Sequence, residues 1–348
     1  MSPYILSTLF LGLGLGTAIT FASSHWLLAW MGIEMNTLAI LPLMAQHHHP
    51  RAVEATTKYF LTQATAAAML LFASTTNAWL TGQWDIQQMS HPLPTTMIIT
   101  ALALKLGLAP LHSWLPEVLQ GLDLTTGLIL STWQKLGPFA LILQLQPTNP
   151  TILMTLGLTS TLVGGWGGLN QTQLRKLLAY SSIAHLGWMI LVLQFSPSLT
   201  LLTLLTYMAM TLSTFLVFKL NNSTSINTLA TSWAKAPALT SITPLILLSL
   251  GGLPPLTGFM PKWLVLQELT KQGLALTATL AAVSALLSLY FYLRLSYAMA
   301  LTMPPNNLVN TAPWRLPPSH PTMPLAISTT LAISLLPSTP ALATLLTL

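Results

Sequence analysis

Charged residues make up only 5% of this 348-residue chain, and hydrophobic residues make up 53%. A soluble domain carries about 25% charged residues, so this chain cannot cover a surface that faces water. Its apolar residues form long runs, and about 20 such residues cross a bilayer as a helix. A helix also satisfies its backbone hydrogen bonds without water. The sequence therefore predicts an all-α membrane protein.

Polar segments divide the chain into eleven apolar runs. Their approximate limits are 3–22, 26–45, 59–80, 96–120, 124–146, 150–170, 177–195, 199–219, 240–271, 273–302 and 324–346. We predict about eleven transmembrane helices in a single polytopic domain covering residues 1–348. The last run is predicted to be a separate C-terminal helix.

The basic residues between the runs predict the orientation. With the N-terminus on the inner side, eight basic residues in loops and at helix ends fall inside and only Lys271 falls outside. The inner residues are Arg51, Lys58, Arg175, Lys176, Lys219, Lys235, Arg294 and Arg315. This asymmetry follows the positive-inside rule and favours an inner N-terminus. We attribute the net charge of +6 to these loops rather than to nucleic-acid binding.

One motif occurs twice. Residues 107–117 and 252–262 both read Gly-Leu-x-Pro-Leu-x-x-aromatic-apolar-Pro-charged. Five predicted spans separate the copies, and an odd number places the second copy upside down relative to the first. The pattern predicts two inverted five-helix repeats, approximately 1–146 and 150–302, as in many transporters.

Each copy of the motif places glycine and proline inside an apolar run, at Gly107 and Pro110 and at Gly252, Pro254 and Pro255. Proline removes a backbone donor and clashes with the preceding turn, so we predict a broken helix at each place. Paired helix breaks in a membrane indicate a transport path. Ordinary proline kinks in packed helices are the alternative.

Four of the charged residues within the runs are predicted to lie at membrane depth: Glu34, Lys105, Lys135 and Lys262. A charge at the centre of a spanning helix costs about 2.5–3.5 kcal/mol. These side chains should therefore face the protein interior. Glu34 and Lys105 are the natural ion pair, and a buried amine, unlike a guanidinium, can gain and lose a proton. The set predicts a proton relay.

Structural alternatives remain for each of these residues. The Glu34–Lys105 pair could serve only to fix helix packing. Lys262 is nearest an end of its run and could extend toward the membrane surface. His112 and His185 are possible connectors between water-filled segments, and they could equally be packing donors.

Several motifs together resemble the antiporter-like membrane subunits of respiratory NADH dehydrogenase. They are Lys105-x-Gly107-x-x-Pro110-x-His112-x-Trp114-Leu-Pro116, Lys135-Leu-Gly-Pro138, Arg175-Lys176-Leu-Leu-Ala-Tyr180-Ser-Ser-Ile-Ala-His185-x-Gly187 and Gly252-x-Pro-Pro255-x-x-Gly258-Phe-x-Pro261-Lys262. The resemblance covers essentially the whole chain. Length, the context of Glu34 and the order of the motifs are most similar to the animal mitochondrial members.

The resemblance implies two inverted repeats plus a terminal helix, with Glu34 and Lys105 as the pump pair. It implies Lys135 as the central relay residue, Lys262 as the exit-side lysine and His112 as a connector. NADH, FMN, iron–sulfur clusters and ubiquinone would be handled by other subunits. Other membrane-arm and accessory subunits, including neighbouring antiporter-like subunits, and lipids would be the partners. The location would be the mitochondrial inner membrane, with the N-terminus on the matrix side.

Two other functions remain open. The same fold and lysines suit a stand-alone secondary cation/proton antiporter, although such a protein should have several carboxylates at membrane depth and this chain has only Glu34 there. A purely structural membrane subunit is the third possibility. The chain contains no cysteine, which excludes thiolate metal ligands and disulfides.

Overall fold

The computed structural model describes residues 2–46, 48–89, 91–145, 150–234, 236–301 and 322–347. These residues form helices and no strand, which confirms the predicted all-α class. Among them, four helices are long and apolar enough to cross a membrane, or five if a bent C-terminal pair is counted as one span. Lys235 and Arg315, used above for the orientation, lie outside the described residues.

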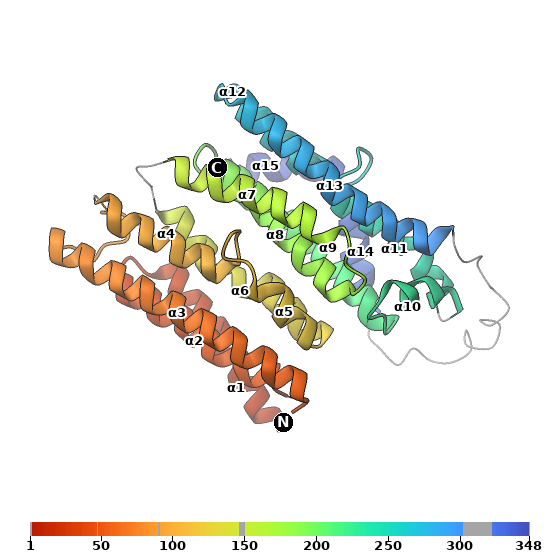
Figure 1. Cartoon of the computed structure of the whole chain (residues 1–348), viewed down its shortest axis with the longest axis horizontal. Coiled ribbons are helices and arrows are strands. Elements are labelled where there is room, and N and C mark those ends of the chain that lie inside the picture. The colour runs from red at the N-terminus through yellow and green to blue at the C-terminus, as the bar shows by residue number, and fades with distance from the viewer. Residues whose placement is uncertain are drawn as a thin grey trace. The chain divides into compact units, whose positions relative to one another are not determined.

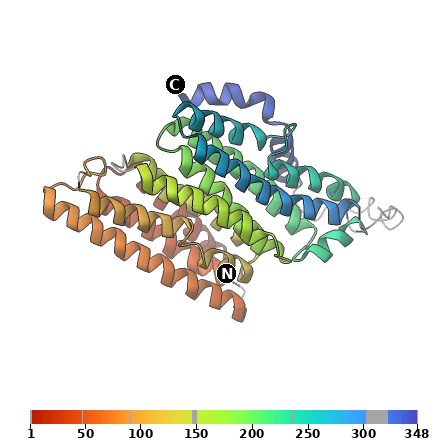
Figure 2. The same cartoon turned by 45° about the horizontal axis from the view of Figure 1, so that its top comes forward.

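The chain folds into two compact units, residues 1–159 and 160–348. Unit 1 contains α1 (Pro3–Ala22), α2 (Trp26–Met44), α3 (Pro50–Thr81), α4 (Pro92–Leu106), α5 (Trp114–Gly121) and α6 (Leu124–Gln144). The boundary between the units falls within α7 (Pro150–Gly168). In unit 1, α1, α2 and α3 lie side by side, and α3 also packs on α4 and α5 (Figures 1 and 2).

Unit 2 contains the end of α7 and the helices that follow. These are α8 (Leu174–Val192), α9 (Pro197–Leu220), α10 (Ile226–Ala230), α11 (Pro237–Gly251), α12 (Phe259–Lys271), α13 (Ala275–Ala300), α14 (Met323–Ser334) and α15 (Thr339–Thr347). Short 3-10 turns lie at Thr231–Ala234 and Leu336–Ser338. Within this unit α11 packs along α13, and α9 packs against α8, α11, α12 and α14 (Figure 1).

Proline and glycine mark the ends of many of these helices. Six of the described helices begin at a proline, whose fixed φ suits the first helical position and whose missing N–H has no partner there anyway. The helices α3, α4 and α11 end at glycines in the left-handed region, Gly82, Gly107 and Gly252, with φ of 74°, 77° and 84°. Only glycine adopts this conformation without a steric penalty.

The predicted helix breaks are present. The run 96–120 is divided into α4 and α5, and the run 240–271 into α11 and α12. The amides of Gly107 and Leu108 both donate to the carbonyl of Ala103, and those of Gly252 and Leu253 both donate to Leu248. The two helix ends are therefore closed by the same hydrogen-bond pattern, which satisfies carbonyls that have no partner within the helix.

Two elements differ from the predicted limits. The helix predicted over 59–80 begins at Pro50, because the polar residues before the apolar run continue the same helix from a proline at its first turn. The predicted C-terminal helix, 324–346, is instead two helices bent by 68°. Pro337 lies at the bend, where it has no amide hydrogen to continue the helical ladder.

Candidate functional site

The predicted ion pair is present in unit 1. The Nζ of Lys105, in the last turn of α4, lies 3.3 Å from Oε1 of Glu34 on α2. The hydroxyl of Thr37 donates to Oε2 of the same carboxylate, also at 3.3 Å. The side chain of Lys105 is 2% exposed and that of Glu34 is 24% exposed. The lysine side chain is therefore buried, whereas the carboxylate is partly exposed and can contact water or another group.

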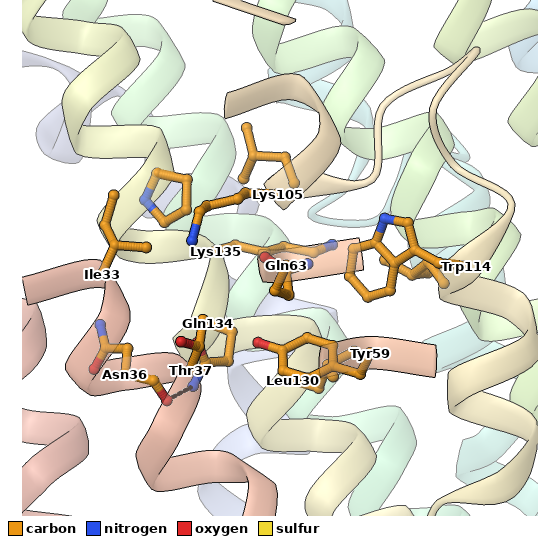
Figure 3. A pocket seen from close by; sticks show the side chains of 13 residues that line it. Ile33, Asn36, Thr37, Tyr59, Gln63, Lys105, Trp114, Leu130, Gln134 and Lys135 are labelled. Carbon is orange, nitrogen blue, oxygen red and sulfur yellow. Dashed lines mark hydrogen bonds between the residues drawn. The ribbon is translucent and has the colours of Figure 1, made fainter. Parts of the chain in front are cut away.

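A small cavity joins Lys105 to Lys135. Both lysines line it, and Lys135 on α6 is 2% exposed (Figure 3). The cavity has about 10 Å³ of space for the centre of a water molecule. Five more polar side chains line it, from three helices: Asn36, Thr37, Tyr59, Gln63 and Gln134. Polar side chains of three helices therefore meet the two lysines in one cavity.

The five additional polar residues were not singled out from the sequence. They carry a signal, because each is a polar residue inside or beside an apolar run. Tyr59 and Gln63 are four residues apart and so lie on one face of α3. Asn36 and Thr37 follow Glu34 by two and three residues, and Gln134 precedes Lys135. Neutral polar residues within spans are also common packing residues, so their position in a run does not by itself identify them as part of a site.

Lys262 lies at the second helix break, in unit 2. Its Nζ donates a 2.7 Å hydrogen bond to the carbonyl of Gly251, the last residue of α11. A cation is favourable at this position, because the C-terminal end of a helix has negative partial charge and unpaired carbonyls. The side chain of Lys262 therefore caps the C-terminal end of α11 and does not extend away from the break.

A second cavity, about 20 Å³ in volume, brings Lys262 together with His185 of α8. Thr203, Thr206 and Gly258 also line it. The imidazole ring of His185 also lies 5.4 Å, centroid to centroid, from the ring of Tyr207 on α9. The predicted connector His185 therefore shares a cavity with Lys262, the lysine of the second break.

The other predicted site residues lie in the breaks themselves. His112 is half-buried in the segment between α4 and α5, and it does not line either cavity among the described residues. Pro110, Pro254 and Pro255 are exposed. In the second break Thr257 occupies the position of His112, and its hydroxyl donates to the carbonyl of Ala332 at 2.6 Å. The described residues include no cluster of three His, Asp or Glu side chains that could bind a metal.

Comparison with known proteins shows which family this chain resembles. Residues 23–288 match the family described as NADH:quinone oxidoreductase/Mrp antiporter, TM, and residues 289–343 match NADH dehydrogenase subunit 2 C-terminus. The chain is 76% identical to NADH-ubiquinone oxidoreductase chain 2 of Tetraodon nigroviridis over 99% of both chains. It is 73% identical to that of Salmo salar over 100% of both.

Solved structures have the same fold. A chain of respiratory complex I from Thermus thermophilus superposes with a TM-score of 0.86 at 30% identity, covering 98% of this chain and 81% of that one. A chain of the Mrp complex from Dietzia sp. superposes with a TM-score of 0.83 at 17% identity, covering 97% and 76%. The second similarity concerns the fold alone. On the identity of its relatives along the full length, the chain belongs to the NADH-ubiquinone oxidoreductase chain 2 family.

Proposed function

We propose that this chain is a proton-translocating membrane subunit of respiratory NADH:ubiquinone oxidoreductase, and that Glu34, Lys105, Lys135 and Lys262 carry the protons. One observation above all supports the relay: two buried lysines, Lys105 and Lys135, line a single polar cavity, and one of them is paired with Glu34. Charged groups at membrane depth are costly, so such a cluster favours a functional site.

The order of the groups within each unit supports a stepwise path. In unit 1 a proton exchanges between the Glu34–Lys105 pair and Lys135 through the first cavity. In unit 2 Lys262 and His185 exchange a proton through the second. His112 is a further connector in this proposal. Electrons do not enter this chain; NADH, FMN, the iron–sulfur clusters and ubiquinone are bound by other subunits.

The membrane arrangement is part of the proposal. About eleven spans form two inverted repeats, 1–146 and 150–302, and a terminal span. The matching hydrogen bonds at Gly107 and Gly252 support the pairing of the two breaks. The subunit lies in the mitochondrial inner membrane with its N-terminus in the matrix, among other membrane-arm subunits. The animal relatives and the complex I structure support this location.

A stand-alone cation/proton antiporter is less well supported. A cation site at membrane depth requires several oxygen ligands, typically carboxylates. In the part of the chain that the structure describes, no acidic residue lines either cavity.

The substitution Lys135→Ala in the assembled complex tests the relay. NADH-driven proton pumping should fall while the complex still assembles, because the central proton carrier is lost. Thr132→Val, one turn earlier on α6, is the matched control and should pump normally. Wild-type pumping by the Lys135→Ala complex, with normal assembly on a native gel, would contradict the relay.

A further inference from the structure

A buried carboxamide in the first cavity has a hydrogen-bond donor without a protein acceptor. Gln63 of α3 is 3% exposed and lines the cavity beside Lys105 and Lys135 (Figure 3). Its Nε2 has no hydrogen-bond partner among the described residues. Leaving such a donor unpaired costs about 1–3 kcal/mol, so native proteins rarely retain one without a use.

The surroundings of Gln63 can hold a water molecule. Tyr59, one turn earlier on α3, is 2% exposed and lines the same cavity. The cavity volume of about 10 Å³ is close to the space that one water needs, and a bound water requires two to four polar partners. Pro138 also lines the cavity and offers no amide hydrogen to the carbonyl of Gln134, one turn earlier. The polar side chains that line the cavity therefore supply the partners that one water needs.

We propose that Gln63 is a positioning residue that holds one water molecule between the amines of Lys105 and Lys135. The Nε2 group donates to the water oxygen and fixes its place. This inference rests on the proposed relay and adds the group that connects its first two steps.

The transfer conserves protons and charge. The ammonium of Lys105 gives one proton to the water, and the water gives one of its own protons to the neutral amine of Lys135. Lys105 ends neutral and Lys135 ends positively charged. Gln63 neither gains nor loses a proton, because its role is to orient the oxygen that accepts and donates.

Gln63→Met separates this role from simple packing. Methionine fills the same space without a donor. If Gln63 only packs, removing an unpaired buried amide should be neutral or stabilising, and pumping should not change. If Gln63 positions the water, pumping should fall although assembly and thermal stability are kept.

The experiment compares proton pumping per NADH oxidised in complexes carrying Gln63→Met, Lys135→Ala or the control Ser74→Ala, which lies on α3 outside the cavity lining. We expect Gln63→Met to lose most of what Lys135→Ala loses, and Ser74→Ala to lose nothing. Normal pumping by Gln63→Met, when Lys135→Ala is impaired, overturns the role of Gln63 alone. Normal pumping by both variants overturns the relay as well. A structure of the wild-type complex that resolves water supplies a second test, and no ordered water within hydrogen-bonding distance of Nε2 would also overturn the inference.

Discussion

The three lysines at membrane depth have different surroundings although they look alike in the sequence. Lys105 bonds a carboxylate, Lys135 lies in a polar cavity, and Lys262 bonds the carbonyl of Gly251. A positive charge on Lys105 is therefore stabilised by the carboxylate of Glu34, and a positive charge on Lys262 is stabilised by the C-terminal end of α11. Substituting Lys262 should disturb the α11 end as well as any proton path, so Lys135 gives the cleaner test of the relay.

A further charged cluster in unit 1 joins Glu54 and Lys58, which precede the predicted span 59–80, to Glu117 of α5. The Nζ of Lys58 on α3 lies 2.8 Å from carboxylate oxygens of both Glu54 and Glu117, and the latter is on α5. Hydrogen bonds to these two carboxylates raise the pKa of Lys58 above its ordinary value of 10.5. The hydrogen bond and charge of Lys58 hold the pKa of Glu54 below 4.5.

The directions of these two pKa shifts predict the pH range in which the charged pair stabilises the fold. The lowered pKa of Glu54 contributes stability above pH 4.5, which is lost as the pH falls through the lowered value. The raised pKa of Lys58 contributes below pH 10.5 and is lost as the pH rises through the raised value. The pair of Glu54 and Lys58 should therefore stabilise the start of α3 between these limits.

We predict that Glu54→Gln increases amide hydrogen exchange in the first turns of α3 relative to wild type at pH 7, because the pair with Lys58 is lost. The difference should shrink as the pH falls below 4.5, because the wild-type carboxylate is then protonated too. High salt should also reduce it, because the pair is exposed to solvent. A difference that does not change with pH would show that the ion pair is not its cause.

At the scale of elements, the two breaks share a hydrogen-bond pattern and differ in how closely their halves approach. Gly258 lies directly before α12, and a Cβ there would overlap the backbone carbonyl oxygen of Ser249 in α11. Its φ of −69° is ordinary, so the requirement is for space rather than conformation. Ser113 occupies the corresponding position in the first break and is exposed. Only the second break needs glycine at this position.

Gly258→Ala should therefore destabilise the complex by about 1–3 kcal/mol, the usual cost of overpacking, because backbone must shift to admit the methyl group. Gly14→Ala is the matched control. A Cβ at Gly14 meets no atom within 4 Å, and alanine favours the helix. Thermal unfolding of the purified complex measures the stability of both variants. Equal unfolding midpoints for the two variants would refute the close approach of α11 and α12.

At the scale of the whole chain, apolar side chains face outward along the helices. On α1 the exposed residues include Tyr4, Phe10, Leu11 and Leu15, with Leu11 64% exposed. Lipid tails or neighbouring apolar subunits can cover such a face, whereas water cannot do so without cost.

Leu11→Lys places a charge near the middle of α1 on this outward face. We expect a cost of about 2.5–3.5 kcal/mol for membrane insertion. The assembled complex should accumulate to a lower level on native gels, and Leu11→Ala should accumulate normally. Equal accumulation of both variants would show that this part of α1 faces water.

The class of the fold, the helix breaks and the Glu34–Lys105 pair could all be predicted from the sequence. These follow from local chemistry: a long apolar run must be helical in lipid, glycine and proline end helices wherever they occur, and one acid at depth has few partners. The bend near Pro337 could have been inferred from the same rule. It was missed because hydropathy does not distinguish one span from two short helices.

The groups that share a cavity could not be predicted from the sequence, because they depend on how the helices pack. Whether Tyr59 and Gln63 face lipid or Lys135 depends on the rotation of α3 about its axis, which packing against α2, α4 and α5 fixes. The bond from Lys262 to Gly251 likewise depends on how α12 folds back at the break. Hydrophobicity acts on each helix separately, whereas a proton path depends on side chains of several helices meeting at one place.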